Sequence, residues 1–463
     1  ASANPVKGGY FILNNLMRGF KGGIYPVNPG YPEIDGLPCY PSVLQVPDPV
    51  DLAIIFVPAA FVPKVLRECA QHGIKGAMIE SSGFAESSEQ GKQLQDSILS
   101  IHRETGIRIW GPNCMGLVDA VQGLVFSFVL PAIWEKGLDP GNVSLVVQSG
   151  MLSAGFLIDI MSNGVMGISK VCSIGNKADI NECDILEYLI NDTDTGVIGL
   201  YLESIPNGQK FMGLCRRSEK PIVVLRGGKS QKGAEAAMSH TASLAGNGAV
   251  ISGALAQVGV VEAHDFKQMM DLCRSLADYP EISTKDSRRV AILTMSGAAG
   301  IVSSDFIVEH ELAVADLSMG TVEALKAIFP GWMPVSNPVD LWPAVELHGR
   351  KKAYTKAFQA VCTDPGVDAV LFHGFVGGDA FRPDISTLVE MAGRAGKPLF
   401  GWVMGKRTEA HQLQVRAKKL GLPIFGELYR AVECMAAVLS RNKLPEHSPS
   451  GISLTGTTGA EEN

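Results

Sequence analysis

The chain has 463 residues, of which 46% are hydrophobic and 19% are charged. This composition is typical of a protein with a large buried core, and it excludes global disorder. The 40 basic and 47 acidic residues give a formal charge of −7, which argues against a nucleic-acid partner and against an anionic membrane surface. At roughly 100–200 residues per domain, the length predicts about three domains.

Neither the apolar stretches nor the cysteines indicate a membrane or an oxidising compartment. The most apolar stretch, 143–160, contains Gln148, Ser149, Ser153 and Asp159, so it lacks the roughly 18 uninterrupted apolar residues of a membrane helix. Residues 1–9 lack the charged and apolar regions of a signal peptide. The nine cysteines stand singly, with no CxxC pair and no metal-ligand spacing. We therefore expect packed, reduced thiols, no bound metal and a cytoplasmic protein.

The first third of the chain alternates short apolar runs with longer amphipathic segments. The runs predict strands, and the segments between them predict helices: strands at 23–27, 52–57, 76–80 and 107–110, helices at 10–18, 61–72 and 89–105. Continuous Val- and Ile-rich runs are typical of parallel strands buried on both faces, and their alternation with helices predicts a doubly wound sheet. Residues 1–10 resemble a turn that enters a helix with no strand before it, so we expect the first strand of this domain to be missing.

Two further series of the same kind follow. The second has predicted strands at 142–148, 167–172, 197–203 and 221–226 and a closing helix at 264–279. The third has predicted strands at 290–294, 369–372, 399–403 and 422–425 and a closing helix at 428–441. We therefore predict domains at 1–136, 137–280 and 289–441, with a polar linker at 281–288 and a flexible linker or tail at 442–463.

Glycine-rich turns are the places where an open α/β sheet binds ligands, because they join strand ends to helix N-termini that attract anions. Four turns have this character: Ala1–Gly9, Trp110–Gly116, Gln148–Met151 and Met295–Gly300. The first lacks GxGxxG, which disfavours a nicotinamide cofactor. Taken alone, each turn is equally compatible with a purely structural role and with a phosphate site. Several such turns in one chain favour a phosphorylated ligand or intermediate.

One histidine lies in an unusual setting. His240 is placed between Ser239 and Thr241 in a loop of small residues, downstream of Lys229. Imidazole is a nucleophile near neutral pH, and a neighbouring carboxylate can fix its tautomer. Glu203, at the end of a predicted strand, is the candidate partner. From the chemistry alone, a capping or packing role for His240 is equally plausible.

The ordered set of motifs resembles the nucleotide-diphosphate-forming acyl-CoA synthetases, relatives of succinyl-CoA synthetase, from residue 1 to about 441. The matching pieces are short but occur in the family's order: Ala1–Tyr10, Tyr25–Pro29, Ser82–Glu86, Gly111–Cys114, Gln148–Gly150, Ser173–Asp179, Glu203–Ser204, Ser239–Thr241 and Asn337–Asp340. The resemblance implies an α/β fold in which a Rossmann-like CoA-binding domain is followed by two flavodoxin-like domains.

The same resemblance implies a role for each motif. His240 is implied to be the phosphorylated histidine and Glu203 the carboxylate that orients it. The helix that starts at Gln148, Ser149 and Gly150 is implied to hold the phosphate. Contacts to CoA are implied for a set in the first third of the chain: Ser2, Lys7, Asn28, Pro29, Asn113 and Cys114. Contacts to the acid substrate are predicted for Gly175, Asn176, Trp332 and Trp342.

The implied function is the ATP-dependent, ADP-forming ligation of a small carboxylic acid to coenzyme A through acyl phosphate and phosphohistidine intermediates. The implied cofactors are CoA and ATP/ADP, with Mg²⁺ in an ATP-grasp part. Because no segment resembles an ATP-grasp module, we expect that part as a separate subunit or fused domain, and we expect an oligomer. Two departures from the family pattern are Ala242, where glycine is common, and Ser296–Gly300 in place of a run of glycines.

Other interpretations remain open at this point. The chain can be a CoA-binding regulatory or acyltransferase-associated module without ligase activity, although the presence of both His240 and Glu203 argues against this. It can also be a CoA ligase coupled to a lyase step on its acyl group. A nicotinamide oxidoreductase is disfavoured by the missing GxGxxG. Trp332 and Trp342 lead to the hypothesis of a bulkier acid, aromatic or cationic, because an indole face attracts cations.

Overall fold

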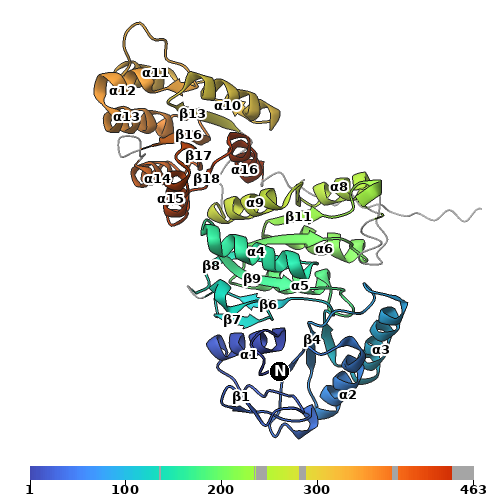
Figure 1. The fold of residues 1–463 in the computed structure, drawn as a ribbon. Coiled ribbons are helices and arrows are strands. Elements are labelled where there is room, and N and C mark those ends of the chain that lie inside the picture. Colours follow the sequence, from blue (N-terminus) through green and yellow to red (C-terminus); the bar gives the residue numbers. More distant parts are fainter. Residues whose placement is uncertain (135–136, 234, 236–247, 281–287, 378–383, 441–463) are drawn as a thin grey trace, which may run out of the picture.

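Three stacked α/β layers make up the computed structural model (Figure 1), which describes residues 1–463 except 135–136, 234, 236–247, 281–287, 378–383 and 441–463. In the described residues, a three-stranded, a seven-stranded and a six-stranded sheet follow one another along the chain. The fold is therefore α/β throughout, as the alternating pattern of the sequence predicts. The predicted linker and tail lie outside the described residues, apart from residue 288.

The first layer is built around a parallel sheet with the order β3-β4-β5. Its elements are α1 (Gly8–Gly19), β1 (Glu33–Ile34), β2 (Leu37–Pro38), β3 (Leu52–Ile55), α2 (Val62–His72), β4 (Gly76–Ile79), α3 (Glu89–Thr105) and β5 (Arg108–Trp110). Short 3₁₀ turns lie at Val43–Gln45 and Ala59–Phe61. Both α2 and α3 end at a glycine with positive φ, Gly73 and Gly106, which closes the helix without steric cost.

The strand predicted at 23–27 is not formed. Val27 makes an isolated bridge with Tyr40, and no regular strand covers the segment. Gly22 and Gly23 weaken extended pairing, and Pro26 has no N–H to donate to a ladder, so the segment runs as irregular chain.

The second layer has the strand order β12-β11-β10-β8-β9-β6-β7. Its elements are β6 (Gly116–Asp119), β7 (Leu124–Phe126), β8 (Pro140–Val147), α4 (Gly150–Asn163), β9 (Ile168–Ser173), α5 (Glu182–Asn191), β10 (Val197–Leu202), α6 (Gly208–Arg217), β11 (Ile222–Arg226), α8 (Gly248–Gln257), β12 (Val261–Ala263) and α9 (Phe266–Asp278), with a 3₁₀ turn at Pro131–Trp134. The strands from β8 to β12 run parallel. The strands β6 and β7 form an antiparallel hairpin, and β6 pairs antiparallel with β9.

This hairpin was not predicted, and it crosses the predicted domain boundary. The residues of β6 and β7 precede residue 136, yet Gly116 pairs with Ser173 and Asp119 with Lys170 in the second sheet. The boundary predicted between 136 and 137 therefore does not coincide with the boundary between the sheets. Pairing between strands far apart in the sequence leaves no local pattern, so periodicity alone cannot reveal it.

The third layer has the order β14-β13-β16-β17-β18, and β15 also pairs with β13. Its elements are β13 (Arg289–Thr294), α10 (Gly297–Glu309), β14 (Ala313–Val314), α11 (Met319–Lys326), β15 (Val339–Asp340), α12 (Trp342–His348), α13 (Arg350–Thr363), β16 (Ala369–Val376), α14 (Ile385–Arg394), β17 (Leu399–Gly405), α15 (Arg407–Lys418), β18 (Ile424–Phe425) and α16 (Leu428–Ser440). All the strand pairs of this layer are parallel.

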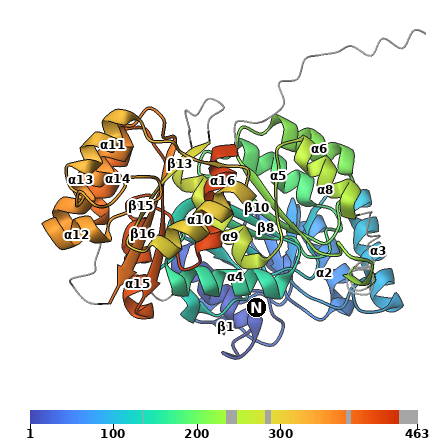
Figure 2. The ribbon, with the colours of Figure 1, turned by 90° about the horizontal axis from the view of Figure 1, so that it is seen from above.

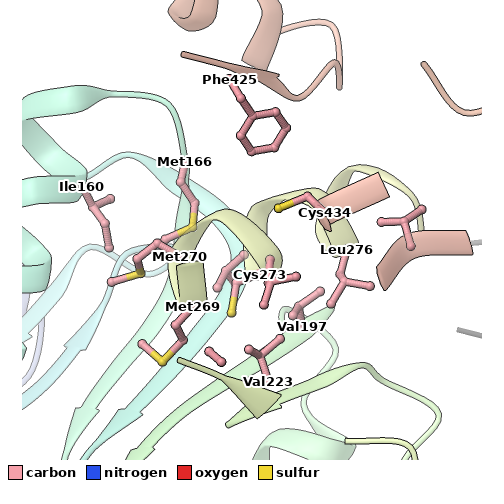
Figure 3. Close-up of a cluster of buried hydrophobic side chains, with 14 of the residues drawn as sticks. Ile160, Met166, Val197, Val223, Met269, Met270, Cys273, Leu276, Phe425 and Cys434 are labelled. Carbon is pink, nitrogen blue, oxygen red and sulfur yellow. The ribbon is translucent and has the colours of Figure 1, made fainter. Parts of the chain in front are cut away.

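One hydrophobic core joins the second and third layers. Seen from above, α9, α10 and α16 lie between α11–α14 on one side and α5, α6 and α8 on the other (Figure 2). Met270, Cys273 and Leu276 of α9 belong to the same buried cluster as Cys434 of α16 (Figure 3). The Tyr279 hydroxyl donates to the Leu399 carbonyl at 2.6 Å. The last two layers are therefore packed through their closing helices.

All nine cysteines are buried and none forms a disulfide, which confirms that the thiols pack in the interior. Within the described residues, no helix combines the length and the apolarity that a membrane crossing requires.

Candidate active site

The carboxyl edge of the second sheet joins two predicted residues, Gln148 and Glu203. Gln148 follows β8 and is 5% exposed. Its Oε1 accepts hydrogen bonds from the backbone N–H groups of Glu203 at 2.8 Å and Ser204 at 3.2 Å. The Gln148 carboxamide thus fixes the backbone directly after β10, at Glu203 and Ser204. The Gln148 Nε2 group donates to Ser204 Oγ at 3.4 Å, so both ends of the carboxamide contact the segment directly after β10.

Glu203 itself is half-buried beside a tyrosine. The Tyr201 hydroxyl donates to Glu203 Oε1 at 3.3 Å. Burial raises the pKa of Tyr201 to about 12, with the neighbouring Glu203 carboxylate as a further cause. The tyrosine is therefore a neutral donor at physiological pH, and it holds one oxygen of the carboxylate in place.

Ser149 and Gly150 form the start of α4, as the sequence predicts. Ser149 is the N-cap, and its Oγ accepts from the Leu152 N–H at 3.4 Å. Both residues are half-buried, whereas Met151 is 81% exposed. The first backbone N–H groups of a helix have no partners within the helix. This helix start can therefore offer donors to an anion at the edge of the sheet next to Glu203.

Gly227 and Gly248, described residues on either side of the segment that contains His240, lie near the carboxyl end of β11. Ser239, His240 and Thr241 lie outside the described residues. Before them, the chain leaves β11 through Gly227, where an added Cβ would lie 3.6 Å from Glu203 Cγ. After them, α8 starts at Gly248, where an added Cβ would meet the Lys229 carbonyl oxygen at 2.6 Å. Gly227 therefore lies beside Glu203, and Gly248 lies beside Lys229, two residues further along the chain from Gly227.

The turn after β5 and the turn after β9 interlock between the first and second layers. The Asn176 N–H donates to the Pro112 carbonyl and the Ala178 N–H to the Gly111 carbonyl, both at 2.9 Å. Gly175 has φ +54°, and a Cβ there would overlap the carbonyl oxygens of Pro112 and Asn113. Only glycine fits this close approach. The structure therefore places Asn113 and Gly175, predicted separately, in one contact.

Asn176 ties this contact to the first layer. Its Oδ1 accepts from Asn113 Nδ2 at 3.3 Å, and its Nδ2 donates to Glu86 Oε2 at 2.6 Å and to Gln95 Oε1 at 3.0 Å. Both the oxygen and the nitrogen of the Asn176 carboxamide therefore form hydrogen bonds. Glu86 is the last residue of the Ser82–Glu86 motif and was not predicted as a site residue. Its other oxygen accepts from the Gly83 N–H at 2.7 Å.

Lys177 is the main site residue that the sequence analysis missed. Its Nζ lies 2.8 Å from Glu182 Oε2, with the two side chains only 4% and 1% exposed. It also donates to the Ser204 carbonyl at 2.9 Å and to Ser204 Oγ at 3.2 Å. This buried cation therefore links the interlocked turns to the edge that holds Glu203. A lysine directly after Gly175-Asn176 in a motif of small and polar residues was the available signal.

The predicted CoA residues of the N-terminal turn lie together. Asn28 Nδ2 donates to the Ala1 carbonyl at 2.8 Å, and the Ala1 amino group donates to the Val27 carbonyl at 3.0 Å. Ser2 Oγ accepts from the Asn4 N–H at 3.1 Å, and Pro29 is exposed. The turn therefore lies against the segment that contains Asn28 and Pro29.

Lys7 is the exposed N-cap residue of α1, at the end of the same turn. Behind it, a Cβ at Gly8 would meet the Phe56 ring at 2.6 Å. Phe56 follows β3, so α1 starts at the carboxyl edge of the first sheet. Four of the six predicted CoA residues, Ser2, Lys7, Asn28 and Pro29, thus lie in one region.

Cys114 differs from the other predicted CoA residues. Its side chain is 2% exposed, and its Sγ lies 3.4 Å from the Ile79 carbonyl. Burial raises the pKa of the Cys114 thiol well above its usual range, with Glu80 as a further cause. The thiol is therefore turned into the protein, and Cys114 as a whole is buried.

Trp332 and Trp342 are not brought together. Trp332 is 77% exposed, whereas Trp342 starts α12 and is 47% exposed. Trp342 lines a cavity of about 260 Å³ at the carboxyl edge of the third sheet, together with Met295, Ser296, Arg350, Tyr354, Gly374 and Phe375. Trp332 is not part of this lining, although the two tryptophans flank the same loop. Arg350 and Tyr354, from α13, were not predicted, because no local motif connects them to Trp342.

Two sequence families match the first two layers. Residues 1–120 match the family described as CoA binding domain, and residues 140–276 match the succinyl-CoA ligase like flavodoxin domain. The fold and the interlocked turns thus define a CoA-binding domain joined to succinyl-CoA ligase-like flavodoxin domains.

The similarity to complete proteins is more specific. Acetate–CoA ligase [ADP-forming] I subunit alpha of Pyrococcus furiosus is 36% identical over 96% of this chain and 95% of its own length. Acetate–CoA ligase [ADP-forming] II of Archaeoglobus fulgidus is 38% identical over 95% of this chain and 64% of its own length. The chain belongs to the ADP-forming acetate–CoA ligase family and corresponds to its alpha-type part.

The solved structures agree with this assignment. The dinucleotide forming acetyl-coenzyme A synthetase 1 of Ca. Korarchaeum cryptofilum, in complex with phosphate and ADP, superimposes with a TM-score of 0.85 at 31% identity. The match covers 95% of this chain and 93% of that chain. By contrast, this chain spans only about half to two thirds of three curated relatives, namely 64%, 47% and 52% of their lengths.

Proposed function

We propose that the chain is the CoA-binding and phosphohistidine-bearing part of an enzyme that ligates a small carboxylic acid to coenzyme A with conversion of ATP to ADP. The observation that carries this proposal is the convergence, at one sheet edge, of Glu203, the start of α4 and Gly227, which precedes the segment that contains His240. A nucleophilic imidazole, an orienting carboxylate and free helix amides are the groups that a phosphohistidine step requires.

The proposed reaction has three steps. His240 takes the γ-phosphoryl group of ATP and ADP leaves; the phosphoryl group then passes to the carboxylate of the acid to form an acyl phosphate. The CoA thiolate attacks the acyl carbon, the C–O bond to phosphate breaks, and acyl-CoA and phosphate leave. Glu203 orients the imidazole, and the N-terminal amides of α4 stabilise the phosphoryl oxygens. In such transfers the protein contributes mainly positioning and charge stabilisation.

The CoA molecule is proposed to lie along the carboxyl edge of the first sheet. Ser2 and Lys7, at the N-terminal turn and the start of α1, would face its phosphates, with Asn28 and Pro29 beside them. The chain of contacts from Asn113 through Asn176 and Lys177 to Ser204 connects this edge to Glu203. Because glycine at 175 and the buried lysine keep this connection rigid, the thiol of CoA can be presented to the phosphoryl-transfer site.

The nucleotide is proposed to bind outside this chain, in an ATP-grasp subunit or fused domain that supplies Mg²⁺. The P. furiosus relative is named as an alpha subunit, and other relatives are longer single chains, which is consistent with both arrangements. Among the described residues, no group of three or more His, Cys, Asp or Glu is arranged to hold a metal ion. We expect the complete enzyme to be an oligomer that includes the nucleotide-binding part.

The proposal is tested by phosphorylating the complete enzyme with γ-labelled ATP and Mg²⁺. We expect one acid-labile, base-stable label per chain, absent in His240→Asn. Glu203→Gln should slow labelling about 100-fold, as expected when an orienting or acid–base group is lost. Glu187→Gln, which changes a half-exposed carboxylate on α5, is the matched control. Labelling of His240→Asn at the wild-type rate would refute the proposal.

The same experiment separates the alternatives. A CoA-binding module without ligase activity would bind CoA but carry no label and form no thioester. A ligase coupled to a lyase step would carry the label and convert its acyl-CoA further. Product analysis by mass spectrometry after addition of acid and CoA distinguishes these outcomes.

A further inference from the structure

A glutamate is buried where the first layer meets the second. Glu80 directly follows β4, and its backbone N–H donates to the Ile55 carbonyl at 3.0 Å, so it lies at the carboxyl edge of the first sheet. The residue is 3% exposed, and neither carboxyl oxygen has a hydrogen bond of normal geometry with the described residues. Because a buried charge is costly unless it is paired, this environment favours the neutral acid over the carboxylate.

The carboxyl group of Glu80 lies against the hairpin of the second sheet. Its Oε1 is 2.6 Å from the position that a Cβ would take on Gly116, the first residue of β6, and the Phe126 carbonyl oxygen is closer still to that position. Gly116 has φ +87°, a conformation that glycine adopts without strain. The close approach of Glu80 and Phe126 therefore depends on a residue without a side chain.

The groups around this carboxyl offer it no compensating charge. Gly116, Phe126 and Phe128, from β6 and from the end of the hairpin, are not titratable. The titratable group that acts on Glu80 is the Cys114 thiol, from the turn after β5. Burial raises the pKa of Glu80 well above its usual range, and the backbone N–H of Phe128 opposes this shift only in part. The folded chain therefore holds the proton on Glu80.

Phe128 connects Glu80 to the start of α1. Its Cβ lies 3.2 Å from the position that a Cβ would take on Gly8, the first residue of α1, and its ring packs against the Phe56 ring at 5.3 Å. The carbonyl groups of the residues before and after Phe128 both accept hydrogen bonds from Asn15 Nδ2 of α1, at 2.8 Å. A displacement of Phe128 would therefore also displace the start of α1, next to the turn where we place CoA.

We propose that Glu80 is a positioning residue for CoA, and that its neutral acid form keeps α1 and the N-terminal turn docked on the hairpin of the second layer. Loss of the proton would leave a buried carboxylate beside the Phe126 carbonyl oxygen with no cation to compensate it. The segment around Phe128 would then move away and carry the start of α1 with it. The inference rests on the proposed CoA site and makes its affinity dependent on pH; it does not involve the phosphohistidine step.

The test is a calorimetric titration of CoA into the complete enzyme, wild type and Glu80→Gln, from about pH 6 to about pH 9.5. This range includes the pKa values of about 8–9 that are documented for fully buried glutamates. Glutamine has the shape of the neutral acid and cannot ionise. The ionisation of CoA itself affects both proteins alike, so it cancels in the ratio of their dissociation constants.

We expect the ratio of the wild-type to the Glu80→Gln dissociation constant to be close to one at the acidic end and at least tenfold higher at the alkaline end. The reason is that the apparent dissociation constant rises as the binding-competent, protonated fraction falls. Glu104→Gln, which changes a half-exposed carboxylate on α3 of the same layer, is the matched control and should follow the wild type at every pH. A purely structural role of Glu80 would not produce this pH profile.

Infrared difference spectra of wild type and Glu80→Gln at neutral pH test the protonation state without CoA. We expect the carbonyl stretch of one protonated carboxylic acid in the wild type that the variant lacks. A ratio of dissociation constants that stays constant over the whole range would overturn the inference and leave the CoA site intact, and so would the spectrum of an ionised carboxylate. If neither protein bound CoA at any pH, the proposed CoA site would be refuted together with this role of Glu80.

Discussion

Replacing Lys177 by methionine removes one partner of a buried ion pair and leaves the other without compensation. Lys177 Nζ lies 2.8 Å from Glu182 Oε2, and the two side chains are 4% and 1% exposed. Removing one member of such a pair costs about 3–5 kcal/mol, because a buried charge loses its partner. At about 2–4 °C per kcal/mol for a domain of this size, we expect the melting temperature of the second layer to fall by about 6–20 °C.

The matched control is Lys210→Met. Lys210 pairs with Asp184 at 3.2 Å in the same layer, but the two side chains are 41% and 32% exposed. Surface pairs contribute about 0–1 kcal/mol, so this variant should shift the melting temperature by less than about 4 °C. Differential scanning fluorimetry of both variants and the wild type gives the comparison.

The double variant Lys177→Met, Glu182→Leu tests the cause of the loss. If the cost comes from an uncompensated carboxylate, removing that carboxylate should recover much of the stability. Equal melting temperatures for Lys177→Met and Lys210→Met would refute the assignment of Lys177 as the buried link of the site. A double variant no more stable than Lys177→Met would refute the electrostatic explanation.

Two further variants test the interlock and the third sheet. Gly175→Ala places a Cβ against the Pro112 carbonyl. We therefore expect calorimetry to show that this variant binds CoA at least tenfold more weakly than the wild type. The control is Gly396→Ala, which has φ +64° but open space around it and should leave CoA binding unchanged. His373 is buried between Ser303 Oγ and Thr294 Oγ1, and burial lowers its pKa to about 3. Because the unfolded chain binds the proton first, the stability that neutral His373 provides is present above about pH 6.5 and is lost as pH falls toward 3. Between pH 7 and pH 5, the wild type should therefore lose about 2 kcal/mol more unfolding free energy than His373→Gln in denaturant titrations, and equal losses would contradict this.

The regular parts of the fold could be predicted because their signals are local. The helix at Glu89–Thr105 has a serine N-cap and a glycine after its last residue, and both limits are confirmed. Strands such as β10 and β11 are continuous apolar runs buried on both faces. The hairpin β6–β7 pairs locally but its two short strands were not recognised, and its pairing with β9 spans residues far apart in the chain.

In the candidate site, too, local features were predicted from the sequence and contacts between distant elements were not. The turns with Gln148 and Asn113 were found from glycine and small polar residues at strand ends, but the interlocking of the Asn113 turn with the turn after β9 was not. Arg350 lines its cavity together with residues from other elements, so no spacing in the sequence reveals it. Lys177 stands in a recognised motif, but its contacts with Glu182 and Ser204 could not be read from the sequence. For Gln148 and Cys114, the residues were placed at the right edge, but burial directs one side chain to the backbone of β10 and the other into the interior.

The phosphohistidine can be tested most directly without any nucleotide. The complete enzyme is incubated with acyl-CoA and labelled inorganic phosphate, and the labelled peptide is identified by mass spectrometry. We predict one phosphoryl group on His240 for each CoA thiol released, and no label in His240→Asn. Release of CoA with phosphate on another residue, or no phosphorylation of an enzyme that still forms acyl-CoA in the presence of ATP, would contradict the proposed mechanism.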